Sequence, residues 1–206
     1  MYIGRFVIVG KTEAGAWYLA YRVSSRSFPN RRIAVQPDRA MVVPTEDAPR
    51  SDNPYISYNC MRMSGSTVVV ANGTQVDPII DKVSLGMPLR DAMALSLLAL
   101  DYEHDDYNTP RVVAAVDGAS DEGYLGIVGD DRVIIKRMEA TPGEAYLVAT
   151  YELTDPTPIS LAGETAEALC DAVYECEYER PVAALAVLLG EGAPGVAARS
   201  ACNATG

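Results

Sequence analysis

The chain begins with two runs of β-forming residues around a polar turn: Tyr2-Ile-Gly-Arg-Phe-Val-Ile-Val-Gly-Lys-Thr-Glu-Ala-Gly-Ala-Trp-Tyr-Leu-Ala-Tyr-Arg-Val23. Tyr2–Val9 and Trp17–Val23 are rich in aromatic and β-branched residues, which favour strands. Lys11-Thr-Glu-Ala-Gly15 between them predicts a hairpin turn. The first run has neither a basic leader nor a small-residue cleavage site. It therefore predicts a strand rather than a signal peptide, and a cytoplasmic protein.

Strands and helices then follow in two blocks. Further strands are expected over Ile33–Gln36, Ala40–Val43, Ile56–Met63, Thr67–Ala71, Arg111–Val116, Tyr124–Val128, Arg132–Arg137 and Glu144–Thr150. Helices are expected over Pro78–Ser84, Pro88–Leu100 and Thr165–Glu177. A loop is expected over Thr45–Asn53, either a helix or a buried strand over Pro181–Leu189, and a loose tail from Gly190.

This order of elements predicts an α+β fold. Two blocks of strands, each associated with helices, indicate two stacked sheets with helices outside them, a four-layer αββα sandwich. No linker divides the chain, so a single domain over residues 1–206 is expected.

Composition narrows the class of protein. Residues 1–100 carry 11 Lys+Arg against 8 Asp+Glu, whereas residues 101–206 carry 6 against 20, for a net charge of -11. Such an acidic chain repels nucleic acid, and no apolar run is long enough to span a membrane. Only three of the basic residues are lysines, which fits a chain adapted to a salt-rich cytoplasm. The four cysteines form no CxxC pair, so neither structural zinc nor a disulfide framework is expected.

A cationic stretch stands out against this acidity: Arg22-Val-Ser-Ser-Arg-Ser-Phe-Pro-Asn-Arg31. Its arginines offer planar donors that match phosphate or carboxylate oxygens, and its serines add hydroxyl donors. The stretch predicts an anion-binding site. The alternative is a surface strand whose arginines pair with the chain's own carboxylates.

A second segment, Asn53-Pro-Tyr-Ile-Ser-Tyr-Asn-Cys60, joins polar and nucleophilic side chains. On a strand, alternation places Tyr58 and Cys60 on one face with Ile56, and Asn59 on the other. Tyr58 could donate a proton or a hydrogen bond. Cys60 could be a nucleophile with His104 as base, or simply a small core residue.

Two further segments carry candidate chemistry. Asp101–Arg111 could hold a metal, form a solvated loop, or supply one buried glutamate whose pKa is raised by desolvation. Asn108 and Arg111 add an amide and a cation there. The turn at Asn72-Gly73 precedes a helix start, where backbone N–H groups favour anions, and Lys82 is either a ligand group or a helix-capping surface lysine.

Taken together, these segments resemble the archaeal IMP cyclohydrolase family. The matching runs are Met1–Arg5, Tyr21–Arg31, Asn53–Cys60, Asp81–Asp91 and Leu98–Glu103 with Asn108–Arg111, in one order within roughly the first 120 residues. The resemblance implies a fold like that of the N-terminal nucleophile hydrolases. Met1 is followed by Tyr2, so that fold would be used without an N-terminal nucleophile.

The resemblance also implies a reaction: 5-formamidoimidazole-4-carboxamide ribotide (FAICAR) closes to IMP and water, with no metal or other cofactor. Tyr58 would donate to the formyl oxygen, and Glu103, which lies in a matching run, would assist proton transfer. Lys82 would be the third catalytic residue and would help to position the imidazole carboxamide. The residues implied to bind the substrate are Arg22, Ser24, Arg26, Asn30 and Arg31 at the phosphate and ribose, and Asn59, Asn108 and Arg111 at the imidazole carboxamide.

Two other functions stay open from the sequence. One is a thiol amidohydrolase of the same fold with Cys60 as nucleophile. The other is a purine-nucleotide-binding protein that turns nothing over. A homo-oligomer is expected because the segment Pro88–Leu100 is apolar enough for a subunit contact, although a buried core helix explains it equally well.

Overall fold

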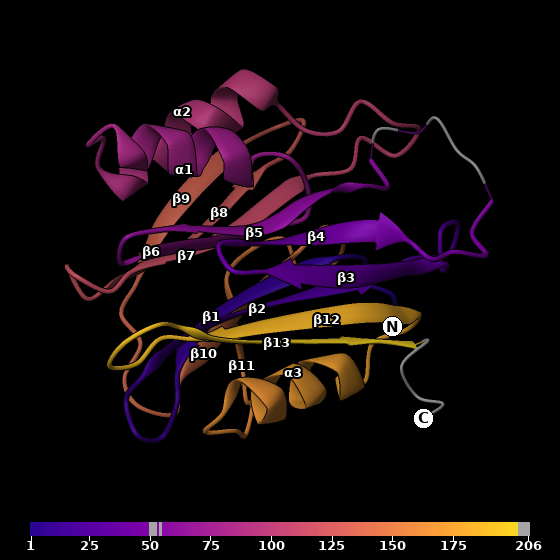
Figure 1. Ribbon diagram of the computed structural model, residues 1–206. Helices are drawn as coiled ribbons and strands as arrows, with labels where there is room; N and C mark the ends of the chain where they lie inside the picture. Colours follow the sequence, from indigo (N-terminus) through magenta and orange to yellow (C-terminus); the bar gives the residue numbers. More distant parts are fainter. Residues whose placement is uncertain (50–52, 54, 202–206) are drawn as a thin grey trace.

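The computed structural model of the protein describes residues 1–49, 53 and 55–201, and this part of the chain forms two antiparallel sheets and three helices (Figure 1). The six-stranded sheet has the order β11 (Thr157–Ile159), β10 (Ala145–Ala149), β1 (Phe6–Lys11), β2 (Trp17–Ser24), β12 (Pro181–Leu188) and β13 (Gly195–Ser200). The seven-stranded sheet has the order β3 (Arg31–Gln36), β4 (Arg39–Pro44), β5 (Tyr58–Ser64), β6 (Thr67–Ala71), β7 (Arg111–Asp117), β8 (Glu122–Val128) and β9 (Val133–Met138). The predicted α+β class is confirmed.

The helices cover the outer faces of the two sheets (Figure 1). Helices α1 (Val76–Ser84) and α2 (Leu89–Leu100) pack on the seven-stranded sheet, and α3 (Ala166–Glu175) packs on the six-stranded sheet. Three apolar clusters fill the interfaces, the largest of them between the sheets. Helix, sheet, sheet and helix therefore follow one another, as expected from the two blocks of strands.

Strand β2 shows how the buried layers use the period of a strand. Tyr21 and Val23 face the core between the sheets, whereas Tyr18 and Ala20 face the core under α3. Because both faces of the strand are covered, every residue of β2 is buried. The same alternation turns Arg22 away from Tyr21.

The described ends of several elements differ from the sequence expectations. Helix α1 begins at Val76, two residues before Pro78, and Pro181–Leu188 is a strand. The expected loose tail is wrong for residues 195–200, because they pair with β12 as strand β13. Strand β11 was not predicted. Residues 50–52 of the expected loop and residues 202–206 of the tail, including Cys202, lie outside the described residues.

None of the described helices combines the length and the apolar character that crossing a membrane requires.

Candidate active site

A cavity of about 400 Å³ opens where strand ends of both sheets come together. The starts of β1, β3, β5 and β7 and the ends of β2 and β10 supply its walls. In antiparallel sheets, alternate strand ends lie at the same edge, so segments far apart in sequence meet there. The lining residues are Tyr2, Gly4, Arg5, Ser24, Ser25, Arg26, Ser27, Phe28, Arg31, Asn53, Tyr55, Ile56, Glu103, Asp105, Tyr107, Thr109, Thr150, Tyr151 and Glu152.

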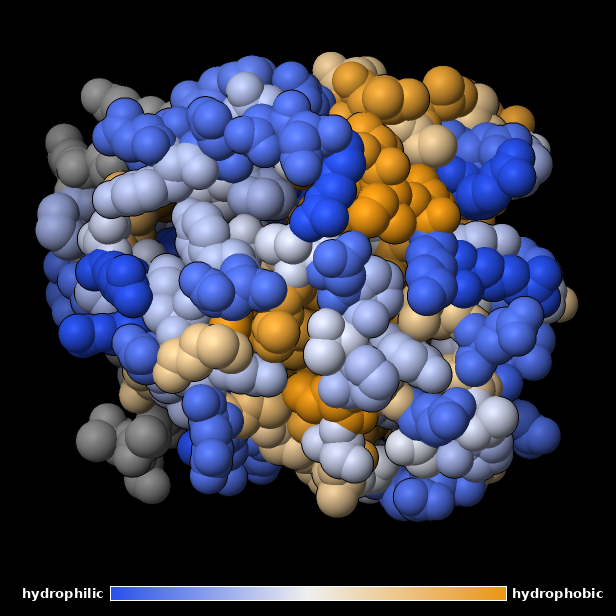
Figure 2. Space-filling view, turned by 180° about the vertical axis from the view of Figure 1, so that it is seen from behind, coloured by the Kyte–Doolittle hydropathy of each residue, from blue (hydrophilic) through white to orange (hydrophobic). Residues whose placement is uncertain are grey.

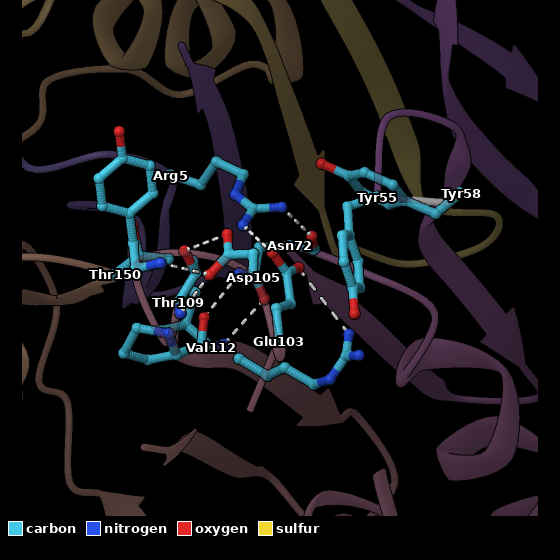
Figure 3. A network of polar contacts seen from close by, with 12 residues as sticks. Arg5, Tyr55, Tyr58, Asn72, Glu103, Asp105, Thr109, Val112 and Thr150 are labelled. Carbon is cyan, nitrogen blue, oxygen red and sulfur yellow. Dashed lines mark hydrogen bonds and ion pairs between the residues drawn. The ribbon is translucent and has the colours of Figure 1, made fainter. Parts of the chain in front are cut away.

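A buried carboxylate lies at the inner end of the cavity. Glu103 is only 1% exposed, and its Oε2 accepts a hydrogen bond from Arg5 Nη2 at 2.5 Å (Figure 3). Arg5 Nη1 also donates to the carbonyl of Asn72 at 2.9 Å. Burial has the largest single effect and lowers the pKa of Arg5, but attraction to Glu103, Tyr58 and Tyr21 and the hydrogen bond to Glu103 together outweigh it, so the pKa lies well above the ordinary value. Arg5 therefore stays charged beside this carboxylate.

The second oxygen of Glu103, Oε1, is buried and has no hydrogen-bond partner among the described residues. Arg111 Nη1 lies 3.8 Å from it, which is too long for a hydrogen bond. Arg111 is held by the carbonyl of Asp101 and by Gln75 Oε1. A buried acceptor without a partner is costly, so Oε1 is available to a group that enters the cavity.

Local backbone geometry presents Glu103 to the cavity. Asp101 ends α2 in the left-handed region, with φ 58, and Glu103 pairs with Thr109 as an isolated bridge. The Asp105 carboxylate then closes the loop by accepting hydrogen bonds from Tyr107 N, Thr109 N and Thr109 Oγ1. This loop is ordered by its own side chains, as is common for functional loops.

The backbone next to Arg5 requires a glycine at position 4. Gly4 has φ 71, and a Cβ on it would lie 2.1 Å from Thr150 Oγ1. The backbone of residues 3–5 can thus pair closely with that of residues 150–151 through Thr150 N to Arg5 O and Tyr151 N to Ile3 O. This contact brings the C-terminal third of the chain to the cavity.

Two tyrosines from different sheets meet beside Arg5. Tyr21 Oη on β2 and Tyr58 Oη on β5 are 2.6 Å apart, and both side chains are buried. Figure 3 shows Tyr58 extending toward Arg5. Both hydroxyl groups are electrostatic neighbours of the Arg5 guanidinium. Tyr58 thus lies next to a residue that lines the cavity, although Tyr58 itself belongs to the inter-sheet core.

The segment between β2 and β3 lines the cavity with cations that have no carboxylate partner among the described residues. Arg31 is 5% exposed and donates from Nε to the carbonyl of Phe28, and no carboxylate among the described residues pairs with it. Ser24 Oγ is buried and has no hydrogen-bond partner in the described part of the chain. Arg26 is exposed and lies over the ring of Tyr2, 4.0 Å from its centroid. These donors are free to meet an anion.

Three predicted site residues lie away from the cavity. Arg22 is fully buried on the α3 side of β2 and donates to the carbonyls of Val173, Cys176 and Tyr178 at the end of that helix. A cation suits the carbonyl-rich end of a helix, so Arg22 has a structural task there.

Asn59 and Lys82 also point elsewhere. Asn59 lies on the outer face of β5, where its Nδ2 donates to Asp77 Oδ1 at 2.8 Å. The predicted alternation along β5 is confirmed, and it directs Asn59 to α1. Lys82 lies in the last turn of α1, donates to the carbonyl of Pro78 and borders a surface groove with Leu85 and Leu95.

Asn30 and Asn108 lie next to the cavity without lining it. Asn30 borders a smaller neighbouring hollow that shares Arg31 and Phe28 with the cavity. Asn108 is exposed and has φ 48, and it connects the lining residues Tyr107 and Thr109. The sequence thus located the correct loops, but neighbouring side chains form the wall.

The geometry does not support a thiol nucleophile. Cys60 is fully buried in the inter-sheet core, where its Sγ donates to the carbonyl of Ala40, and burial raises the pKa of the thiol. His104 is 63% exposed and pairs with Asp101. Among the described residues, no group of histidine, cysteine, aspartate or glutamate side chains is arranged to hold a metal ion.

Sequence reasoning gave no role to several residues that make the site. Arg5 lies in a segment that matches the family. The local feature that could have indicated its role is a single cation between Gly4 and an apolar strand. Tyr21 looked like an ordinary strand residue. Tyr151 and Glu152 lie outside the first 120 or so residues that contain the matching runs, and no motif around them indicates a function.

These features define a class of protein: an α+β protein whose cavity combines a paired, buried carboxylate with arginines that have no carboxylate partner among the described residues. Comparison with known proteins specifies it further. A family model described as IMP cyclohydrolase-like protein matches residues 2–193. The chain therefore belongs to the IMP cyclohydrolase-like family.

Relatives named IMP cyclohydrolase come from several archaea. The chain is 52% identical to the protein of Natronomonas pharaonis over 91% of this chain and 93% of the relative. It is 49% identical to that of Haloquadratum walsbyi, over 95% of both chains. The identity to a Methanococcus maripaludis protein is 46%, over 93% of this chain and 97% of the relative.

Proposed function

We propose that this protein is an IMP cyclohydrolase, which closes FAICAR to IMP and water within the cavity described above. Family membership supports the reaction. The observation that carries the assignment is the buried Glu103 Oε1, which has no partner among the described residues, in a cavity that Arg26 and Arg31 line without a described carboxylate partner. The carboxylate suits proton transfer, and the arginines suit a phosphate.

The reaction places few demands on the protein. The carboxamide nitrogen attacks the formyl carbon of the same molecule and a C–N bond forms. The former formyl oxygen leaves as water with one proton from the attacking nitrogen and one from the formamide nitrogen, which becomes part of the new C=N bond. Orienting two groups on one ring can supply about 7–11 kcal/mol of the barrier. What remains is to accept the nitrogen's proton, stabilise the oxygen as it gains charge, and protonate it.

Glu103 is the acceptor in this proposal. Its Oε1 takes the hydrogen bond of the attacking carboxamide nitrogen, while Oε2 stays bound to Arg5. The guanidinium groups of Arg5 and Arg111 offset the free-energy cost of burying the Glu103 carboxylate. They also hold the carboxylate in place. Arg111 thereby acts through Glu103 and not on the ring directly.

Tyr58 donates to the formyl oxygen. Its hydroxyl is beside Arg5, so a developing oxyanion at that point would meet both a donor and a positive charge. No metal or organic cofactor is required for these steps.

Arg31, Ser24 and Arg26 bind the 5'-phosphate. Arg31 supplies a buried guanidinium and Ser24 a buried hydroxyl, neither of them satisfied by a carboxylate among the described residues. Charge-assisted bonds of this kind are stronger than neutral ones. Arg22, Asn59 and Lys82 take no part in this proposal, because each is bound to another element.

The fold supports a likeness to the N-terminal nucleophile hydrolases at the level of its layers. The amino group of Met1 pairs with Glu179 at 3.1 Å, and Tyr2 follows it in the cavity wall. In our proposal the chain works as a single domain in the cytoplasm, and Glu103 and Tyr58 are the groups that handle the protons.

Self-association accompanies the proposed activity. Leu85 and Leu98 are 89% and 62% exposed, and Leu95 lies near them on the outer side of α1 and α2. Figure 2 shows a hydrophobic area in the upper part of the molecule, where Figure 1 places these helices. Light scattering in molar KCl should give a mass above one chain, and Leu98→Glu should lower it. A wild-type monomer would contradict the proposal.

The activity itself is tested by incubating the purified protein with FAICAR in molar KCl and a metal chelator, and following IMP by ultraviolet absorbance. Ring closure well above the spontaneous rate is expected, and it should be unaffected by thiol alkylation. If the folded protein binds IMP but does not accelerate ring closure, it is a nucleotide-binding protein. Loss of turnover on alkylation would instead point to a thiol hydrolase.

A further inference from the structure

The hydroxyl groups of Tyr21 and Tyr58 share one hydrogen bond, and their surroundings differ. Tyr21 is fully buried in the core between the sheets, and the hydroxyl of Tyr58 at 2.6 Å is its hydrogen-bond partner among the described residues. Burial, followed by the neighbouring Tyr58, raises the pKa of Tyr21 well above its ordinary value, so it keeps its proton. A buried hydroxyl proton needs an acceptor.

The direction of this hydrogen bond decides which hydroxyl proton is left without a partner among the described residues. Tyr21 is 0% exposed, whereas Tyr58 is 4% exposed and lies beside Arg5, which lines the cavity. The nearby Arg5 guanidinium has donors and no acceptor, so the proton of Tyr21 must go to Tyr58 Oη. Were the direction reversed, the proton of Tyr21 would be left buried without a partner. The proton of Tyr58 therefore points away from Tyr21, and no described residue accepts it.

We propose that Tyr21 is a positioning residue that holds the Tyr58 hydroxyl as a donor toward the Arg5 end of the cavity. Accepting the bond from Tyr21 polarises the Tyr58 O–H and makes it a stronger donor. Tyr21 does not touch the substrate. The inference rests on the proposed function, in which Tyr58 donates to the formyl oxygen.

The two residues lie on rigid elements, which suits this task. Tyr21 is in the middle of β2, between β1 and β12, and Tyr58 begins β5. Because the two strands belong to different sheets, the 2.6 Å contact depends on how the sheets stack. A site supported by packed strands keeps its geometry better than one built on loops.

A matched control lies on the same strand. Tyr18 is as buried as Tyr21 but faces the core under α3. Removing its hydroxyl changes neither the cavity nor the inter-sheet contact. Tyr18→Phe thus reports what losing the hydroxyl of another β2 tyrosine does to stability alone.

The test compares Tyr21→Phe, Tyr58→Phe, the double variant and Tyr18→Phe in ring closure and thermal unfolding. Tyr58→Phe should lower kcat by about 10²–10³. Tyr21→Phe should lower kcat by about two- to tenfold with KM unchanged, the effect of one hydrogen bond. In the Tyr58→Phe background, the change at Tyr21 should have no effect on kcat, and Tyr18→Phe should match wild-type kinetics.

Several outcomes would overturn the inference. If Tyr21→Phe kept wild-type kcat, or lowered kcat equally in both backgrounds, Tyr21 would have a structural role only. If Tyr21→Phe did not fold, 3-fluorotyrosine at position 21 keeps the shape and alters only the donor strength. Unchanged kcat in that variant would count against the inference. A wild-type protein without turnover would instead refute the proposed function, and the inference with it.

Discussion

Two pairs of arginines in this protein have opposite surroundings. Arg5 and Arg111 flank one buried carboxylate, Glu103, whereas Arg26 and Arg31 line the same cavity without a carboxylate partner among the described residues. The paired arginines come from segments about a hundred positions apart, and the unpaired ones are five positions apart. A paired cation organises another side chain, and an unpaired one is available to a ligand.

Because their surroundings differ, we expect the two pairs of arginines to affect different kinetic constants. Loss of a group that acts only in the transition state lowers kcat, and loss of one that binds the substrate uniformly raises KM. The inner end of the cavity should therefore control kcat, and the cationic end should control KM. The following variants test that division.

The largest effect is expected from Glu103→Gln. Loss of an acid–base group should lower kcat by about 10²–10⁴. The variant also leaves Arg5 and Arg111 without their anion, and breaking a buried pair costs about 3–5 kcal/mol of stability. Kinetics and urea unfolding measure the two effects.

A surface pair provides the control for this variant. Glu175 accepts a salt bridge from Arg199 at 2.8 Å on the exposed side of α3. Glu175→Gln should cost less than about 1 kcal/mol and leave kcat unchanged, since exposed pairs contribute little. Wild-type turnover in Glu103→Gln would remove Glu103 from the mechanism.

Arg31→Ala should chiefly raise KM. Charge-assisted hydrogen bonds to a phosphate contribute about 1.5–3 kcal/mol, which corresponds to an increase in KM of about 10- to 150-fold. The neighbouring Arg32 is exposed and does not line the cavity, so Arg32→Ala is the matched control. A lower kcat with unchanged KM in Arg31→Ala would contradict the division between the two ends.

Gly73→Ala tests whether Arg111 acts through Glu103. A Cβ on Gly73 would lie 2.8 Å from both Arg111 Nη1 and Gln75 Oε1 and 3.5 Å from Glu103 Oε1, so the Arg111 and Gln75 side chains must shift. Poorer alignment of the Arg111 guanidinium with Glu103 should lower kcat by about tenfold, with KM unchanged. Gly190 has open space around it, and Gly190→Ala should behave as wild type. Unchanged kcat in Gly73→Ala would mean that the position of Arg111 does not affect the reaction.

The smallest effect is expected at Arg26, which is exposed. Arg26→Ala should raise KM by about two- to fivefold at low salt, as exposed charges contribute up to about 1 kcal/mol. Molar KCl should abolish this effect, because screening acts on exposed charges, while the effect of Arg31→Ala persists. Titration of KM against KCl for both variants measures the contrast. An equal salt response would show that both arginines are solvated.

The sequence predicted which segments line the cavity better than it predicted what each residue does there. It predicted that the Arg22–Arg31 stretch binds an anion, and Arg26 and Arg31 do line the cavity. It could not separate them from Arg22, which a one-residue step along β2 turns toward α3. It singled out Glu103 through a family resemblance, but not the arginine that holds it.

What the sequence determined by itself depends on local periodicity and composition. β-Branched runs, turns and helix caps fixed most of the strands and all three helices, since these depend on neighbouring residues. Only the tertiary structure decided that Arg5, Tyr21, Glu103 and Tyr151 come to the same cavity region. Their contacts depend on the register and stacking of two sheets, and these are set by burying apolar area over the whole molecule, which no local segment encodes.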